Sequence, residues 1–345
     1  MRYLGKIFYI MRYFTILFLC FLFACQSEKS PSVAQYFAYP PAQQANAGVQ
    51  MIPIQTPKGT FKVWTKRFGN NPKTKVLILH GGPALTHEYM ECFEPFFLQE
   101  GIEFYEYDQL GSYYSDQPTD SSLWTLDRYV EEVEQVRKAL NLDKDNFYLL
   151  GNSWGGILAM QYALKYQAHL KGLLVCNMMA SYPRYAAYNG VLRSKLRPSY
   201  MDSVNVFEAK GDYKNPIYTN MVTEGYYRKH ICRLAEWPEP VNRGFKHVNE
   251  QIYVILQGPS EFKAGGRLTN WDILDKLPTL QIPTLMVGAQ YDTMDPKDME
   301  EQSKLVQKGR FLFCPNGSHL SMWDDQKVFM GGILRFLRDV EAGKL

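Results

Sequence analysis

The sequence lacks the features that identify several large classes of protein. Its six cysteines form no C-x-x-C pair and no spacing typical of a metal site, and it contains neither a phosphate-binding glycine loop nor the H-E-x-x-H pattern of metalloproteases. Charge is balanced, with 38 Lys and Arg against 35 Asp and Glu and a net charge of +3. Because no basic run is interleaved with aromatic residues, the sequence gives no indication of nucleic-acid binding.

One apolar run stands out, at residues 13–24, and positive residues precede it. The run is short for a transmembrane helix but has the length of a signal-peptide core. Met11 would also begin a complete signal, so translation starts at Met1 or Met11. The run ends in Leu22-Phe23-Ala24-Cys25, which resembles a bacterial lipobox. This pattern predicts a lipoprotein-type signal peptide over residues 1–25 and a lipid on Cys25.

Two other outcomes stay open for this segment: ordinary secretory cleavage, and an uncleaved anchor. With lipidation, we expect a cell-envelope protein that is attached to a membrane by its lipid, in the periplasm or at the outer membrane. Gln26 after Cys25 favours the outer membrane. Residues 26–50 are rich in Ser, Ala, Gln and Pro, which predicts a flexible tether ahead of a folded body that starts at residue 51.

Within the folded body, strand-like and helix-like segments alternate with short links. Such alternation predicts an α/β fold with a mostly parallel sheet covered on both faces, and functional sites at the carboxyl ends of its strands. The pattern breaks over residues 181–271, which predicts an inserted helical lid, or cap, between two parts of the core, 51–180 and 272–345. The expected strands are 76–79, 104–107, 147–150, 172–176, 283–288 and 309–313, and the expected helices are 126–140, 157–164 and 328–340.

The most informative segment is Gly151-Asn152-Ser153-Trp154-Gly155, which joins an expected strand to an expected helix. A G-x-S-x-G sequence in this setting predicts a nucleophile elbow, a tight turn that exposes the serine hydroxyl above the sheet. The flanking glycines are needed where a Cβ would clash. Ser153 is therefore the candidate nucleophile. A packing turn whose serine caps the following helix is the alternative.

A serine hydroxyl needs a base within hydrogen-bond reach and a carboxylate that orients the base, in the chain order Ser, acid, His. His319 follows the last expected strand and is the candidate base. Asp292 is the acid closest to the end of the preceding strand and is the candidate orienting group. Asp295 and Asp298 are its competitors, although both fit the start of the next helix better.

The segment His80-Gly81-Gly82-Pro83-Ala84 follows an expected strand and has the composition of an oxyanion loop. The N–H groups of Gly82 and Trp154 are the candidate donors to the developing negative charge. His80 is expected to brace this loop rather than to react. This machinery needs no cofactor and no metal.

Together, these motifs resemble those of α/β-hydrolases of the proline iminopeptidase group, which includes the tricorn-interacting aminopeptidase. The resemblance covers residues 56–336 and implies the α/β-hydrolase fold, a mostly parallel, doubly wound sheet with an inserted helical cap. It rests on His80-Gly81-Gly82-Pro83, Asp108-Gln109-Leu110-Gly111, Gly151-Asn152-Ser153-Trp154-Gly155-Gly156, Gly258-Pro259-Ser260-Glu261-Phe262, Asn270-Trp271-Asp272 and Gly288 to Asp292.

The resemblance implies release of an N-terminal residue, often proline, from short peptides, with cap carboxylates that hold the free ammonium of the substrate. Glu261 matches one such glutamate. Thr293 stands where a second glutamate is common, so a second carboxylate would have to come from the cap. Leu110 replaces a common Arg and Ala84 a common Gly. The candidates for the second carboxylate are Glu208, Glu224 and Glu236.

The leading hypothesis is a serine hydrolase of prolyl aminopeptidase type, with a short peptide or aminoacyl compound as its substrate. A second hypothesis keeps the triad but gives it an ester, a lactone or a non-peptide amide. A third, from another class, is a catalytically silent binding protein held at the membrane by its lipid. The sequence does not indicate an oligomeric state.

Overall fold

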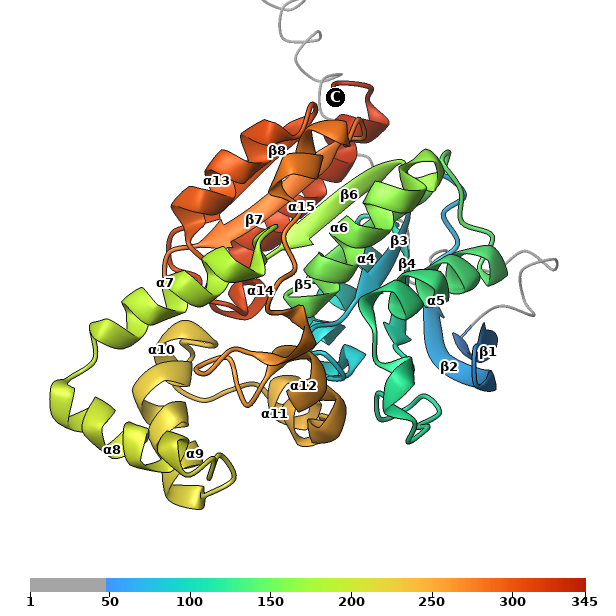
Figure 1. The fold of residues 1–345 in the computed structure, drawn as a ribbon. Coiled ribbons are helices and arrows are strands. Elements are labelled where there is room, and N and C mark those ends of the chain that lie inside the picture. The colour runs from blue at the N-terminus through green and yellow to red at the C-terminus, as the bar shows by residue number, and fades with distance from the viewer. Residues whose placement is uncertain (1–47) are drawn as a thin grey trace, which may run out of the picture.

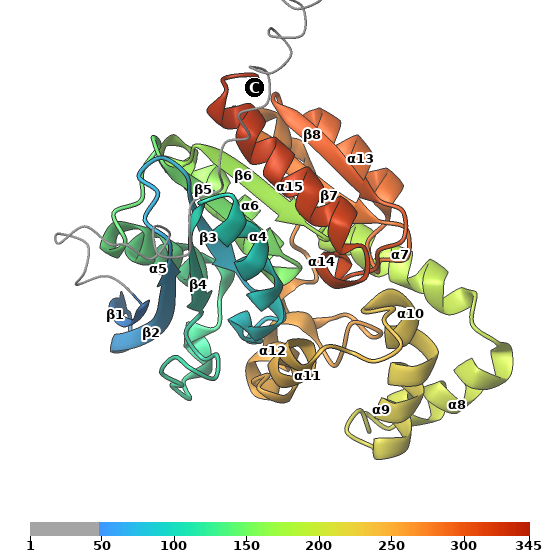
Figure 2. The same cartoon turned by 180° about the vertical axis from the view of Figure 1, so that it is seen from behind.

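The computed structural model describes residues 48–345, which form an eight-stranded sheet with helices on both faces (Figures 1 and 2). The strand order is β1-β2-β4-β3-β5-β6-β7-β8. β2 is antiparallel to both of its neighbours, β1 and β4, and all other neighbouring pairs are parallel. The mostly parallel, doubly wound sheet predicted from the sequence is therefore confirmed. The strands are β1 (Gly48–Thr56), β2 (Gly59–Phe68), β3 (Lys75–Leu79), β4 (Glu103–Asp108), β5 (Phe147–Asn152), β6 (Gly172–Cys176), β7 (Thr284–Ala289) and β8 (Gly309–Cys314).

The central strands are buried along their whole length because helices cover them on both sides. Every residue of β3, β5, β6 and β7 is buried, as expected for parallel strands in the middle of such a sheet. One face packs against α5 (Leu126–Ala139), α6 (Trp154–Tyr166) and α13 (Pro296–Leu305). The other packs against α4 (Glu94–Gln99), α14 (Ser321–Asp324) and α15 (Gln326–Glu341). Short 3₁₀ turns complete the core: η1 (His87–Phe93), η2 (Ser121–Leu123) and η3 (Gln167–His169).

The first two strands form an antiparallel hairpin at one edge of the sheet. β1 begins at Gly48, so residues 48–50 pair with β2 rather than forming the end of the tether. The predicted signal peptide, Cys25 and the rest of the tether lie outside the described residues. Within residues 48–345, no helix combines the length and the apolar character that crossing a bilayer requires.

Between β6 and β7 the chain forms a helical cap that lies over the carboxyl ends of the strands (Figure 1). Its two ends meet where Ser181 and Asp272 form an isolated β-bridge, and the cap has a small apolar core of its own around Val204 and Tyr226. Its elements are α7 (Tyr182–Ser194), α8 (Pro198–Ala209), α9 (Pro216–Val222), the π-helical turn η4 (Thr223–Tyr227), α10 (Arg228–His230), α11 (Glu239–Lys246), α12 (Glu250–Gln257) and η5 (Gly266–Leu268); η6 (Leu274–Thr279) leads back to the core.

Candidate active site

Ser153 lies at a sharp turn between β5 and α6. Its backbone has φ 56° and ψ −125°, a region that residues other than glycine rarely adopt. The flanking glycines make the turn sterically possible. A Cβ on Gly151 would lie 2.0 Å from the carbonyl oxygen of Gly155, and a Cβ on Gly155 would lie 2.2 Å from that of Leu79. The turn therefore has the geometry of a nucleophile elbow.

His319 and Asp292 come together from the loops that follow β8 and β7. His319 Nδ1 donates a hydrogen bond to Asp292 Oδ1 over 2.8 Å, and both side chains are buried. Burial lowers the pKa of His319, but the charge of Asp292 and this hydrogen bond raise it more, so the pKa lies above its ordinary value. With its Nδ1 proton held by Asp292, His319 has Nε2 free to accept a proton.

The two competing acids have other partners. Asp295 is the N-cap of α13, where its side chain accepts a hydrogen bond from the N–H of Lys297 over 3.0 Å. Asp298 pairs with Arg184 at 2.7 Å. The structure thus places Asp292, rather than either competitor, against His319.

Asn177 holds the other oxygen of Asp292, and the sequence did not single it out. Its Nδ2 donates to Asp292 Oδ2 over 2.7 Å and to the carbonyl oxygen of Ser318 over 3.2 Å, while its Oδ1 accepts from the hydroxyl of Ser321 over 3.0 Å. Asn177 therefore orients Asp292, and Asp292 in turn orients His319. The signal that could have identified it is a polar residue directly after a buried strand, here β6.

The candidate oxyanion donors belong to two adjacent turns. Gly82 has φ 110°, where a side chain would be strained, and a Cβ would lie 2.7 Å from the backbone nitrogen of Leu85. Trp154 begins α6 directly after Ser153. Within residues 48–345, neither the N–H of Gly82 nor that of Trp154 donates to a protein acceptor. Both donors therefore remain available to a substrate oxygen.

His80 braces these turns from within the core. Its Nδ1 donates to the carbonyl oxygen of Gly81 over 2.9 Å, and its Nε2 accepts from the N–H of Gln109 over 3.1 Å. Burial lowers the pKa of His80, which suits this neutral tautomer. The side chain of Gln109 in turn accepts from the indole N–H of Trp154 over 2.7 Å. The loops after β3, β4 and β5 are thus hydrogen-bonded to one another.

Ser153, His319 and Gly82 line one small cavity of about 40 Å³, and Glu261 of the cap lines it with them. A larger cavity of about 820 Å³ adjoins it and is lined mostly by cap residues. The residues that line both cavities are Leu85, Ile231, Phe245, Tyr253 and Glu261. These candidate catalytic groups therefore face a mostly apolar space that extends into the cap and is lined by the carboxylate of Glu261.

Glu261 is held by neutral donors rather than by a cation. Its Oε2 accepts from the hydroxyl of Tyr185 over 2.6 Å, and its Oε1 accepts from the hydroxyl of Tyr253 over 2.9 Å and from Gln257 Nε2 over 3.1 Å. Glu261 is 9% exposed, and no Lys, Arg or His within residues 48–345 forms an ion pair with it. This buried carboxylate is fixed in place while its charge is not neutralised.

Comparison with known proteins identifies the family. The model of the α/β hydrolase fold matches residues 74–326. A proline iminopeptidase of Flavobacterium johnsoniae is 66% identical over 296 residues, which cover 86% of this chain and 100% of the relative. A proline iminopeptidase of Elizabethkingia meningoseptica is 66% identical over 294 residues, which cover 85% and 99%. The chain belongs to the proline iminopeptidase family of α/β hydrolases.

A crystal structure of a proline iminopeptidase from Mycobacterium smegmatis agrees with this assignment. It superposes with a TM-score of 0.75 at 26% identity, and the match covers 85% of this chain and 100% of the other. The resemblance inferred from the motifs is thus confirmed, together with the α/β-hydrolase fold and the assignment of the chain to the hydrolases.

Three cap glutamates were candidates for a second carboxylate beside Glu261, and none of them lines the cavity of Ser153. Glu208 is paired with Arg193 at 2.8 Å. Glu224 is paired with Arg228 at 2.8 Å, and Glu236 is exposed. Among the described residues, Glu261 is the one acid that lines the cavity of Ser153.

The three departures from the family pattern lie inside the structure. Thr293 is buried, and its hydroxyl donates to Asp292 Oδ1 over 3.3 Å. Ala84 has φ 58°, which explains why glycine suits this position. Leu110 is also buried, and its N–H donates to Glu132 over 2.9 Å. All three therefore lie in loops that support the site rather than in contact with solvent.

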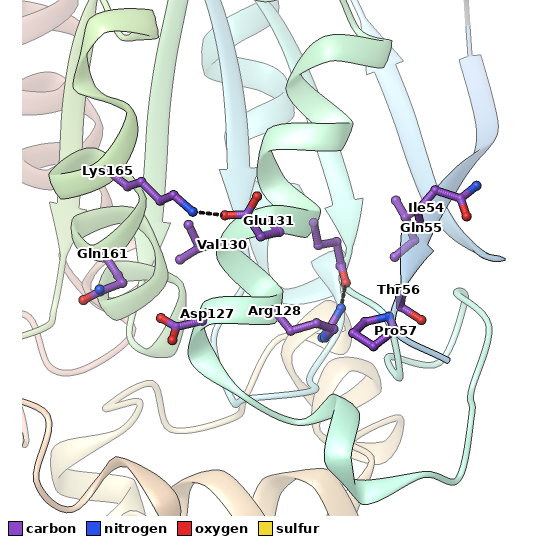
Figure 3. Close-up of a pocket in the computed structure, with 11 residues that line it drawn as sticks. Ile54, Gln55, Thr56, Pro57, Asp127, Arg128, Val130, Glu131, Gln161 and Lys165 are labelled. Carbon is purple, nitrogen blue, oxygen red and sulfur yellow. Dashed lines mark hydrogen bonds and ion pairs between the residues drawn. The ribbon is translucent and has the colours of Figure 1, made fainter. Parts of the chain in front are cut away.

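A separate cavity of about 630 Å³ lies between β1, α5 and α6 (Figure 3). Two ion pairs line it, one between Lys165 and Glu131 and one between Arg128 and Glu132. None of Ser153, Asp292 and His319 lines it. We therefore place the candidate site in the cavity of about 40 Å³ that Ser153 lines, although the cavity between β1, α5 and α6 is larger.

Proposed function

We propose that the protein is an aminopeptidase that releases an N-terminal residue, often proline, from short peptides through an acyl-enzyme on Ser153. One observation carries the proposal. Glu261, a buried carboxylate without a cationic partner, lines the same cavity as Ser153 and His319. A carboxylate of this kind stabilises a buried substrate ammonium, and an internal peptide bond has no such group to offer.

In the proposed reaction, Ser153 Oγ attacks the carbonyl carbon of the N-terminal residue while its proton passes to His319 Nε2. The N–H groups of Gly82 and Trp154 stabilise the oxyanion of the tetrahedral intermediate. His319 then donates this proton to the leaving amine as the C–N bond breaks. Water, activated by His319, hydrolyses the acyl-enzyme in the same way and restores Ser153. Asp292 keeps the imidazole oriented throughout.

The first test compares a chromogenic proline amide with a free amine against the same amide after N-acetylation. We expect the free amine to be hydrolysed faster by a factor on the order of a hundred, because acetylation removes the charge that Glu261 would bind. Initial rates of a soluble form that begins after Cys25 measure this ratio. Equal rates, or turnover of esters alone, would assign the site to a different acyl substrate.

We further propose that residues 1–25 are a lipoprotein-type signal peptide and that the mature protein is attached to a membrane of the cell envelope through Cys25. The lipobox-like end of the apolar run supports this proposal. Residues 26–47 would then separate the lipid from the sheet, whose first strand begins at Gly48.

Replacing Cys25 with serine is expected to move the protein from the membrane fraction to the soluble fraction and to abolish incorporation of labelled palmitate, because serine cannot carry the thioether-linked lipid. Cell fractionation and labelling in a bacterial host measure both effects. A variant that stays in the membrane fraction would point to an uncleaved anchor. A wild-type protein that is soluble would point to ordinary secretory cleavage.

A further inference from the structure

Asn249 lies between α11 and α12, where the cap reaches the core. It is the N-cap of α12, and its Oδ1 accepts a hydrogen bond from the N–H of Ile252 over 3.4 Å. Asparagine is among the preferred residues at this position because its side chain satisfies an unpaired N–H of the first turn. Helix capping thus accounts for the side-chain oxygen of Asn249 but not for its backbone N–H or its Nδ2.

The two donor groups of Asn249 bind two loops of the core. Its backbone N–H donates to the carbonyl oxygen of Ala84 over 3.0 Å, and its Nδ2 donates to the carbonyl oxygen of Gly111 over 3.0 Å. The second contact is close because Gly111 has no side chain. A Cβ there would lie 2.2 Å from Ile252 of α12. One cap residue is therefore bonded to the loops after β3 and after β4.

Both loops determine where the oxyanion donors lie. Ala84 is two residues after Gly82, one of the two donors, in the turn that ends at Leu85. Gly111 is two residues after Gln109, which binds the indole of Trp154 over 2.7 Å and so supports the second donor. A shift of either loop relative to the cap would change the position of a donor relative to the substrate.

On the other side of Asn249, α12 carries two of the three residues that donate hydrogen bonds to the Glu261 carboxylate. Tyr253 and Gln257 lie one turn apart on this helix, and both donate to Glu261 Oε1. Asn249 thus joins the start of the helix that holds Glu261 to the loops that hold the oxyanion donors.

We propose that Asn249 is a positioning residue for peptide-bond cleavage. It fixes the position of Glu261 in the cap relative to the oxyanion donors in the core. This inference rests on the proposed aminopeptidase function. A substrate bound by its ammonium reaches the transition state only if its carbonyl oxygen lies between the two donors. A displacement of about 1 Å is enough to cost up to a hundredfold in rate.

The test replaces Asn249 with serine, which still caps α12 but cannot reach Gly111 with a donor. The matched control is Asn215→Ser. Asn215 caps α9 in the same way, accepting from the N–H of Ile217 over 3.0 Å, and among residues 48–345 its Nδ2 binds Asp212 of the cap and no other residue. Titration with a serine-directed fluorophosphonate gives the active fraction, so that kcat refers to folded enzyme.

For the free proline amide, we expect kcat of Asn249→Ser to fall tenfold to thirtyfold with KM changed less than threefold, and Asn215→Ser to change neither by more than twofold. In a Glu261→Gln background, Asn249→Ser should cost less than threefold, because the partner that it aligns is already lost. An equal loss in both backgrounds, or no loss in kcat, would overturn the proposal. Failure of the aminopeptidase function itself would instead be seen in the wild type, as equal rates on free and acetylated amides.

Discussion

Replacing Ser153 with alanine is expected to lower kcat/KM on a proline amide by a factor of about 10⁴ or more. The hydroxyl oxygen that forms the acyl-enzyme is removed, and only the rate supplied by the oxyanion donors and by binding remains. The fold should not change, because alanine keeps the Cβ that this strained turn already accommodates. Initial rates and thermal unfolding of the same preparation measure the two quantities.

Ser203→Ala is the matched control, since Ser203 lies in α8 of the cap and, within the described part of the chain, its hydroxyl binds only the carbonyl oxygen of Ser199. Its rate should equal that of the wild type. An unchanged rate in Ser153→Ala would eliminate the proposed mechanism. If, in addition, a fluorophosphonate failed to label folded wild-type protein, the silent binding protein would become the better hypothesis.

The sequence was sufficient to predict the parallel strands β3 to β8 and the candidate catalytic groups because both depend on local patterns, whereas the hairpin of β1 and β2 was not expected. Buried parallel strands are mostly apolar. The turns after them contain residues, such as glycine, that few other residue types can replace. Gly151 and Gly155 illustrate this, since a Cβ on either would lie within about 2 Å of a backbone oxygen. Ser153, Asp292 and His319 were therefore selected as the candidate triad by their place after a strand.

The contacts that support the site could not be predicted in this way, because they join residues far apart in the chain. Asn177 and Asp292 are 115 positions apart, and Asn249 and Gly111 are 138 apart. A capping asparagine looks the same in sequence whether or not its amide also binds another loop. The sequence also did not indicate that Glu208 pairs with Arg193. This ion pair distinguishes Glu208 from Glu261, which has no cationic partner among the described residues.

Replacing Glu261 with glutamine is expected to lower kcat/KM for the free proline amide by a factor of about 10² to 4 × 10³. Glutamine keeps the size of the side chain and some of its hydrogen bonds but removes the charge. A buried ammonium would then lack its partner, and breaking a buried pair in this way costs about 3–5 kcal/mol, where each 1.4 kcal/mol corresponds to a factor of ten. The N-acetylated amide has no ammonium, so its slow hydrolysis should change much less.

Glu224→Gln is the control for this variant. Glu224 also lies in the cap, but Arg228 binds it at the surface, where an ion pair contributes little, so both amides should keep their wild-type rates. The ratio of the free to the acetylated rate is the decisive quantity. If Glu261→Gln lowered both rates equally, Glu261 would be acting on the shape of the cavity or on His319 rather than on the amine. A fall confined to the free amine would show that one carboxylate, supported by tyrosine hydroxyls and an amide, is sufficient for amine selection in a chain with Thr293 beside its triad aspartate.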